Sequence, residues 1–186
     1  MKPVSETAAY FGGLVLRTFG WTIEGRLPAD PKYVLIVAPH TSNWDFPVGF
    51  AAKQALRLEC HFMAKDSLFW WPLGAFMRSV GGLPVNRAAA GDVVGTVARA
   101  FQEAPRFVLV IAPEGTRSRV ERWKSGFHRI ARAAEVPVFL ATFDYSRKVV
   151  RLGPQFAAGE DYDADLAAIR AHITPAMACR PQNYAA

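Results

Sequence analysis

Long apolar runs and amphipathic segments alternate along this chain of 186 residues. Residues 33–38 (YVLIVA) and 107–112 (FVLVIA) are almost entirely apolar, which is typical of strands that are buried on both faces of a sheet. Shorter apolar runs predict further strands at residues 60–64, 83–85, 137–143 and 148–152.

The segments between these runs predict helices, because they are longer and repeat apolar side chains with helical spacing or lack turn signals. Pro72 and Gly74 interrupt one of them, which we expect to be irregular. The predicted helices span residues 45–59, 67–80, 92–103, 126–135 and 161–173. Strands that alternate with helices predict a single α/β domain with a largely parallel central sheet flanked by helices.

The composition fits such a domain and limits the chemical classes of partner that we expect for it. Apolar residues make up 51% of the chain and charged residues 20%, which excludes general disorder. The net charge is +6, and 16 of the 22 basic residues are Arg, beside 13 Phe, 5 Trp and 5 Tyr. A basic, aromatic-rich chain favours an anionic partner: nucleic acid, a phosphorylated metabolite or anionic lipid. Aromatic residues and Arg are not interleaved as in RNA-binding domains, so we expect no nucleic acid.

The sequence offers no motif for a metal or a bound cofactor. Cys60 lies in an apolar segment and forms no C-x-x-C pair with Cys179, and neither a Walker loop nor a G-x-G-x-x-G fingerprint is present. His61, His128 and His172 lack a partner pattern, so we expect packing or surface roles for them. We therefore expect a site without metal or cofactor. The oligomeric state stays open.

A polar cluster, residues 39–45 (PHTSNWD), follows the first apolar strand. Ligands of parallel sheets bind beyond the carboxyl ends of strands. With a helix N-cap at Thr41 or Ser42, the His40 imidazole can fold back toward the Asp45 carboxylate, which gives a general base and a group that orients it. The alternative is that His40 and Asp45 only cap the helix.

Two further clusters also stand at strand ends. In residues 113–119 (PEGTRSR), Gly115 allows a tight turn, Arg117 and Arg119 can form a fork for phosphate, and Glu114 can accept a hydrogen bond from a hydroxyl group. In residues 81–87 (GGLPVNR), Arg87 is a candidate phosphate ligand. The alternative for both clusters is an exposed loop with solvated charges.

The order of these blocks is more specific than any one of them. H-x-x-x-x-D, G-G-L-P-V-N-R, P-E-G-T-R-S and V-P-V (residues 136–138) follow one another across residues 33–145. This order resembles the glycerolipid acyltransferase family, which includes the bacterial 1-acylglycerol-3-phosphate acyltransferases. Residues 124–127 (KSGF) are similar to the family's K-x-G segment. The resemblance implies a glycerolphosphate-acyltransferase-like fold.

The resemblance also implies a role for each matching residue. His40 would be the general base that deprotonates the acceptor hydroxyl of a lysolipid, and Asp45 would orient it. That oxygen would attack the thioester of acyl-CoA or acyl-ACP, a co-substrate, without a covalent acyl-enzyme. Pro137 would lie on the acyl-donor side. The substrate-binding residues implied by the matching blocks are Arg87, Glu114, Gly115, Thr116, Arg117 and Lys124.

Three positions depart from the common family pattern. Pro39 and Thr41 stand where many members have Asn and Gln, and Ala112 stands where Phe is common. These changes leave the proposed base and arginines intact. We therefore hypothesise an acceptor other than lysophosphatidic acid.

A lipid acceptor requires contact with a membrane. We expect residues 1–20 to form an N-terminal interfacial arm or helix, with Leu14 and Leu16 in contact with lipid, and residues 21–186 to form the catalytic domain. Trp70 and Trp71 are a second candidate contact, for which the alternative is ordinary core. The N-terminus does not resemble a cleaved signal peptide, so we expect a peripheral protein on the cytoplasmic face of an anionic membrane.

Two other functions stay open at this point. One is a hydrolase that uses His40 and Asp45 with Ser42 or Ser118, although no G-x-S-x-G elbow is present. The other is a non-catalytic module that binds lipid or phosphate.

Overall fold

The computed structural model describes residues 3–85 and 93–185, and within them seven strands form one sheet in the order β1-β7-β6-β2-β5-β3-β4. All neighbouring strands run parallel except β6 and β7, which are antiparallel. The strands are β1 (Thr22–Glu24), β2 (Lys32–Ala38), β3 (His61–Lys65), β4 (Gly82–Val85), β5 (Phe107–Ile111), β6 (Val138–Asp144) and β7 (Val149–Phe156). The predicted α/β domain with a largely parallel sheet is confirmed.

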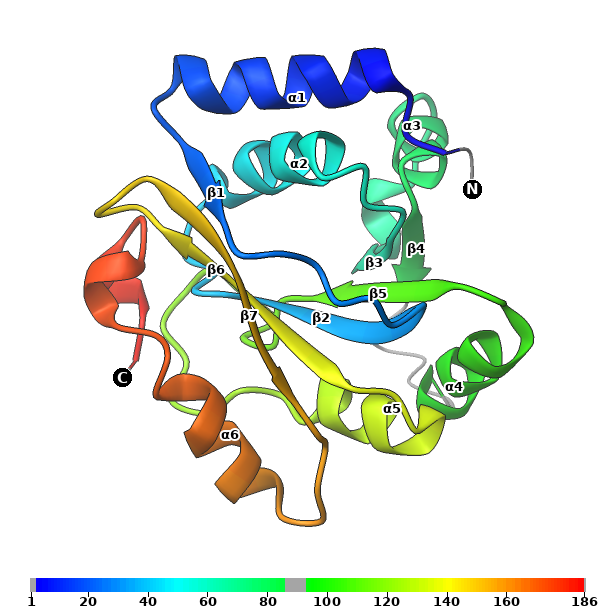
Figure 1. Ribbon diagram of the computed structural model, residues 1–186. Helices are drawn as coiled ribbons and strands as arrows, with labels where there is room; N and C mark the ends of the chain where they lie inside the picture. Colours follow the sequence, from blue (N-terminus) through cyan, green and yellow to red (C-terminus); the bar gives the residue numbers. More distant parts are fainter. Residues whose placement is uncertain (1–2, 86–92, 186) are drawn as a thin grey trace.

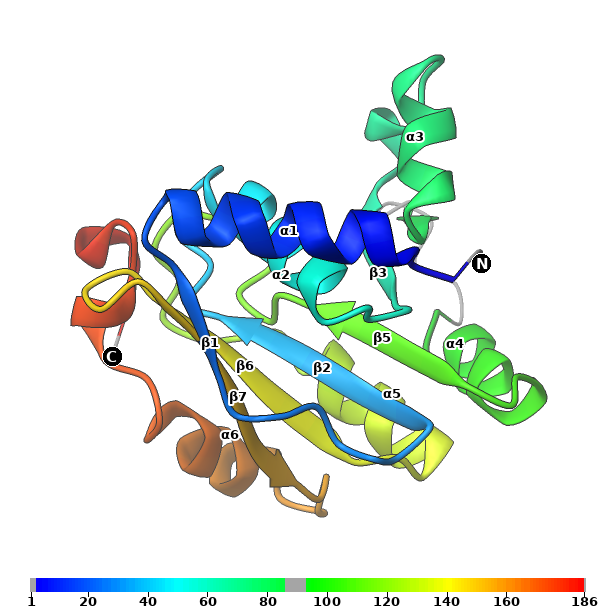
Figure 2. The same cartoon turned by 45° about the horizontal axis from the view of Figure 1, so that its top comes forward.

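Helices cover both faces of this sheet (Figure 1). The helices α1 and α2 lie on one face, and α4, α5 and α6 lie on the other. Their bounds are α1 (Glu6–Thr18), α2 (Asp45–Ala55), α3 (Leu73–Ser79), α4 (Val93–Glu103), α5 (Gly126–Ala134) and α6 (Tyr162–Arg170), with short 3₁₀ turns η1 (Asp66–Leu68), η2 (Pro175–Met177) and η3 (Pro181–Asn183). Figure 2 shows α3 on the same side of the sheet as α1, near the N-terminal end of that helix.

The central strands are apolar throughout because each of their faces packs against a separate core. Successive side chains of a strand point to opposite faces. Val34 and Ile36 of β2 therefore join the core beneath α4, α5 and α6, whereas Tyr33 and Leu35 join the core beneath α1 and α2. This arrangement places the carboxyl ends of β2, β5 and β6 at one edge of the sheet.

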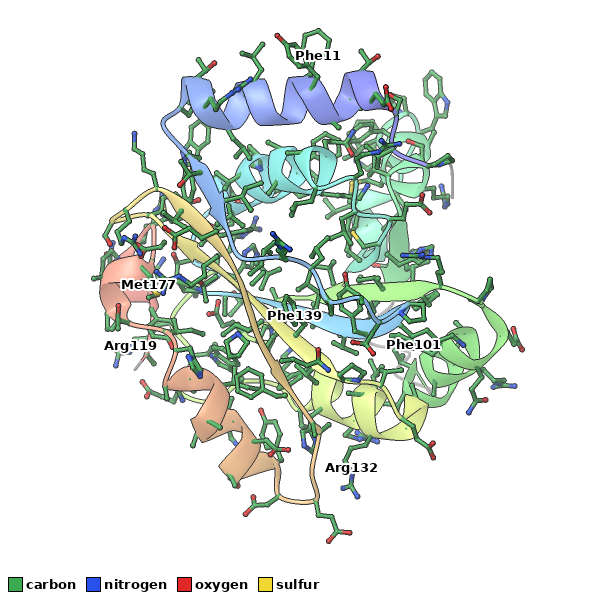
Figure 3. The ribbon with its side chains drawn as sticks, in the orientation of Figure 1. Phe11, Phe101, Arg119, Arg132, Phe139 and Met177 are labelled. Atoms are coloured by element: carbon green, nitrogen blue, oxygen red, sulfur yellow. The ribbon has the colours of Figure 1, made fainter. Side chains whose placement is uncertain are left out.

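Helix α1 packs closely on α2. A Cβ atom at Gly12 would lie 2.6 Å from the carbonyl oxygen of Ala51, so only glycine permits this approach. Leu16, one helical turn further on, is 4% exposed and belongs to the same core. The predicted membrane contact of Leu16 is therefore wrong, because the i and i+4 spacing turns it toward α2. Leu14 lies on the exposed side, as does Phe11, which points away from α2 (Figure 3).

Several predicted boundaries shift. Helix α2 ends at Ala55 rather than at residue 59, because the chain reverses at Arg57, whose φ is 51°. The irregular helix predicted for residues 67–80 divides into η1 and α3. Strand β7 continues through Pro154 to Phe156, and β1 was not predicted. His128 is buried against α6 with its Nε2 atom 2.9 Å from the Asp165 carboxylate, which agrees with the expected packing role.

In the part of the chain that the structure describes, no helix is long and apolar enough to cross a bilayer.

Candidate active site

His40 and Asp45 meet where β2 gives way to α2. The His40 Nδ1 atom lies 3.1 Å from Asp45 Oδ2, and the Asp45 side chain is buried while the imidazole is 26% exposed. When Nδ1–H is donated to the carboxylate, the lone pair is on Nε2, the atom that is free to take a proton from a substrate. The structure therefore brings the predicted base and its orienting group together.

The helix that follows this loop is not capped as predicted. Helix α2 begins at Asp45 with Trp44 as its N-cap, so neither Thr41 nor Ser42 caps it. Instead Asp45 Oδ2 accepts hydrogen bonds from the backbone N–H groups of Thr41 (2.8 Å) and Ser42 (2.9 Å). The carboxylate in the first turn of α2 thus holds the preceding loop by hydrogen bonds, which fixes the position of His40.

A third side chain, missed by the sequence analysis, completes this arrangement. The Tyr145 hydroxyl, directly after β6, donates a 2.7 Å hydrogen bond to Asp45 Oδ1. The two residues are 100 positions apart, and no motif joins them. The available signal was topological: Tyr145 follows a predicted strand, and the carboxyl ends of parallel strands gather at one edge.

Glu114 is buried beside the same loop, so the solvated-loop alternative is wrong for this residue. Its Oε2 atom accepts a 2.8 Å hydrogen bond from the backbone N–H of His40. Its Oε1 atom has no partner among the described residues. Burial raises the pKa of Glu114 to about 7, and the His40 N–H bond and the positive charge of Arg170 offset this only in part. Glu114 therefore links the segment after β5 to the segment after β2 by a hydrogen bond.

Gly115 and Lys124 also lie together. Gly115 has a φ of 69°, a left-handed conformation that favours glycine. A Cβ atom there would lie 3.0 Å from Lys124 Cε, so the lysine side chain crosses directly over the glycine. The backbone N–H of Lys124 donates to the carbonyl oxygen of Pro113 at 2.9 Å, which joins the two segments.

The remaining predicted residues fall into three groups. Thr116 and Arg117 are exposed on the loop after β5, and Arg119 pairs with Glu121 at 3.3 Å in solvent, so Arg119 is not oriented toward a shared phosphate site with Arg117. Pro137 precedes β6 and lies at the opposite edge of the sheet from His40. Arg87 lies outside the described residues.

Neither candidate nucleophile for a hydrolase is hydrogen-bonded to His40 within the described residues. Ser42 is buried, and its Oγ accepts the backbone N–H of Trp44 at 3.2 Å. Ser118 is exposed and only its N–H is engaged, with Thr116 Oγ1 at 3.3 Å. No three His, Cys, Asp or Glu residues of the described chain converge to hold a metal ion.

The C-terminal segment closes over the site loops. The Arg180 backbone N–H donates to Thr41 Oγ1 at 3.2 Å, and Asn183 Nδ2 donates to the carbonyl oxygens of Thr41 (3.4 Å) and Arg117 (3.0 Å). The guanidinium of Arg170 holds the chain end through the carbonyl oxygen of Ala185. This segment, red in Figure 1, therefore links the histidine loop with the E-G-T-R loop.

An apolar cavity of about 290 Å³ is lined by His40 and Asp45 together with side chains of α2 and the sheet. Apart from His40, Asp45, Lys53 and the thiol of Cys60, its lining is apolar. The lining includes, among others, Phe46, Gly49 and Phe50 of α2, Val37 and Val110 of the sheet, and Met77 of α3. A polar pair in the lining of an apolar cavity suits a substrate with an apolar chain and a reactive polar group.

Comparisons with known proteins agree with this geometry. Residues 22–142 match a protein-family model described as Acyltransferase. Among solved structures, the 1-acyl-sn-glycerophosphate (LPA) acyltransferase PlsC from Thermotoga maritima is similar over 90% of this chain and 77% of its own, with a TM-score of 0.65 and 17% identity. A search of curated proteins finds no significant match.

Proposed function

The chain belongs to the acyltransferase family, and we propose that it transfers a fatty acyl group from acyl-CoA or acyl-ACP to the hydroxyl group of a lysolipid. The observation that carries this proposal is the apolar cavity whose lining includes the His40–Asp45 pair. A lysolipid is also the type of acceptor suggested by the structural likeness to PlsC, a 1-acyl-sn-glycerophosphate (LPA) acyltransferase.

In this proposal His40 is the general base. Nε2 takes the proton of the acceptor hydroxyl while the oxygen attacks the thioester carbonyl carbon. The carbon–sulfur bond then breaks, and the thiolate leaves with the proton from the imidazolium. Asp45 stabilises that imidazolium and holds the ring, as the carboxylate of a hydrolytic triad does. General-base catalysis of this kind contributes about 10²–10⁴-fold.

The cavity would hold a hydrocarbon chain. Its volume of about 290 Å³ lies at the lower end of the range of ligand pockets, about 300–1,000 Å³. Burying each methylene stabilises the complex by about 0.8 kcal/mol, so the cavity strongly favours a fatty acyl group over an acetyl group.

The acceptor would bind on the opposite side of His40, at the loop after β5. Arg117 and Lys124 carry positive charge there, and Glu114 and Gly115 shape the backbone around them. We propose that Arg117, with Arg87 and Lys124, binds the acceptor's phosphate, and that Thr116 contacts the same headgroup. Because Pro39, Thr41 and Ala112 depart from the family pattern, we further propose an acceptor other than lysophosphatidic acid.

One comparison tests the reaction. The purified protein is incubated with a long-chain acyl-CoA or acyl-ACP, with and without a panel of lyso-acceptors, and products are identified by mass spectrometry. We expect thioester consumption only with an acceptor. Consumption without one would indicate a hydrolase, and none at all would indicate a binding module. Rapid acylation of lysophosphatidic acid alone would contradict the proposed acceptor.

The His40→Ala variant tests the base. We expect acyl transfer to fall by about 10²–10⁴-fold with an unchanged circular dichroism spectrum, since that is the usual contribution of a general base. His172→Ala is the matched control, because His172 is exposed and its ring lies against Phe156, which pairs with Val138 at the start of β6, the edge of the sheet opposite His40, and it should keep full activity. Retained turnover in His40→Ala would remove this residue from the mechanism.

A further inference from the structure

Both oxygen atoms of the Asp45 carboxylate are engaged, and each by a different part of the chain. Oδ2 faces His40 Nδ1 at 3.1 Å and the two loop N–H groups. Oδ1 accepts the Tyr145 hydroxyl at 2.7 Å, the shortest of these contacts. The carboxylate can therefore rotate away from His40 only by breaking the bond with Tyr145.

We propose that Tyr145 is a positioning residue for acyl transfer, which acts on His40 through Asp45. The inference rests on the proposed role of His40 as the general base. Tyr145 lies three residues beyond the 22–142 segment that matches the family model, so the match itself assigns it nothing.

Tyr145 is itself held in place from two sides. Its ring lies edge-on to the buried Trp21 ring, with centroids 4.8 Å apart and an interplanar angle of 89°. Its backbone N–H donates to the carbonyl oxygen of Met177 at 2.9 Å. A side chain fixed by packing in this way can fix its own hydrogen-bond partner, which is how outlying residues preorganise a catalytic group.

The Tyr145 hydroxyl keeps its proton at neutral pH. Burial and the neighbouring negative charge of Asp45 raise the pKa of Tyr145 well above its ordinary value, and the thiol of Cys179 acts in the same direction. Tyr145 is therefore a permanent donor to Asp45. Glu114, after the end of β5, is a further titratable group close to His40 and Asp45, and the positive charge of Arg170 partly offsets the rise in its pKa.

The Tyr145→Phe variant tests the proposal, because it removes the hydroxyl and keeps the ring against Trp21. Without this donor, the charge of Asp45 is less stabilised and attracts the His40 proton more strongly. We expect the acidic limb of the kcat/KM profile to move to higher pH. We also expect kcat to fall about tenfold, the effect of losing one hydrogen bond to a charged group, with KM changed less than about twofold.

A measurement without substrate separates this proposal from the proposed function. NMR titration of the imidazole signals, with His40 assigned from His40→Ala, reports the pKa of His40 directly. An upward shift in Tyr145→Phe supports the positioning role even if the protein transfers no acyl group. An unchanged titration overturns it even if wild-type transfer is fast.

The matched control is Tyr33→Phe. Tyr33 is also a buried tyrosine that packs edge-on to an aromatic ring, Phe139, but it lies within β2 and outside the site. We expect this variant to keep the wild-type pH profile. An equal shift in both variants would mean that general loosening of the fold, and not the hydroxyl on Asp45, is responsible.

Discussion

Asp45 and Glu114 are two buried carboxylates with opposite surroundings. Asp45 accepts hydrogen bonds from Thr41, Ser42 and Tyr145 and faces His40, so its charge is well compensated. Glu114 accepts only the His40 N–H, and its second oxygen lacks a partner among the described residues. A buried charge without compensation is costly, and the pKa of Glu114 rises accordingly. At the scale of single residues, the number of donors decides which carboxylate can serve as a fixed anion.

The raised pKa of Glu114 predicts a specific dependence of stability on pH. The folded protein holds this proton up to about pH 7, whereas the unfolded chain releases it near its ordinary value of 4.5. The stabilisation is therefore complete below pH 4.5 and is lost as the pH rises through 7. Across this window it amounts to about 3 kcal/mol.

Glu114→Gln removes this titration. We expect the free energy of unfolding of the wild type, measured by urea denaturation, to decline relative to that of the variant between pH 5 and pH 8 by on the order of 2–3 kcal/mol. Other titrating groups cancel in the comparison. Parallel stability curves for the two proteins would show that Glu114 does not titrate in this range.

At the scale of elements, the contact between α1 and α2 depends on one glycine. A methyl group at Gly12 would lie 2.6 Å from the carbonyl oxygen of Ala51 and 2.8 Å from the backbone nitrogen of Ala55, both rigid backbone atoms. The same group at Gly13 would meet nothing within 4 Å. The two neighbouring glycines therefore have opposite roles in one helix.

We expect Gly12→Ala to lower the free energy of unfolding by about 1–3 kcal/mol, since the helices must move apart. Gly13→Ala should raise it by up to about 1 kcal/mol, because alanine favours the helix. Thermal or urea denaturation of both variants checks the pair. The packing would be refuted if both substitutions shifted stability in the same direction.

Elements with a strong local pattern could be predicted from the sequence, and those fixed by distant contacts could not. The apolar runs of β2 and β5 are unambiguous because both faces of these strands are buried. Three-residue β1 has too short a pattern, and the end of α2 depends on the left-handed Arg57. Leu14 and Leu16 read alike in the sequence, and only the position of α2 separates them.

The same distinction holds for the site. His40 and Asp45 are five positions apart, so one loop motif reveals both. The burial of Glu114 could not be predicted from the polar segment E-G-T-R, because the neighbouring strand and its loop produce it. Tyr145 and Asn183 reach the loop from distant parts of the chain, through contacts that only the folded sheet creates.

At the scale of the whole molecule, exposed aromatic side chains gather on the side of α1 and α3. Trp70 and Trp71 near α3 are 60% and 84% exposed, and Phe11 of α1 is 57% exposed. The apolar cavity is lined by α2 and by Leu68 and Met77 from the same side of the sheet. A surface of this kind, beside a cavity suited to a hydrocarbon chain, is typical of contact with lipid.

We therefore propose that this side of the molecule docks on an anionic membrane, with Leu14, Trp70 and Trp71 among the contacts. Each ring that enters the interface contributes roughly 1–2 kcal/mol at ~25 cal/mol per Å² of apolar surface. Each nearby basic residue adds about 1 kcal/mol when the lipid is anionic. The apolar and electrostatic contributions add to each other in the proposed docking.

Flotation on vesicles tests this docking surface. We expect the wild type to float with phosphatidylglycerol vesicles and weakly with phosphatidylcholine alone, and Phe11→Ser, Trp70→Ser and Trp71→Ser combined to weaken binding at least about tenfold. These side chains are exposed, so the variant should fold normally.

Arg129→Gln with Arg132→Gln is the control, since both residues are exposed on α5, on the other face of the sheet, and Arg132 points away from α1 (Figure 3). Undiminished flotation of the aromatic variant, or an equal loss in the α5 control, would mean that general positive charge and not this surface holds the protein on lipid.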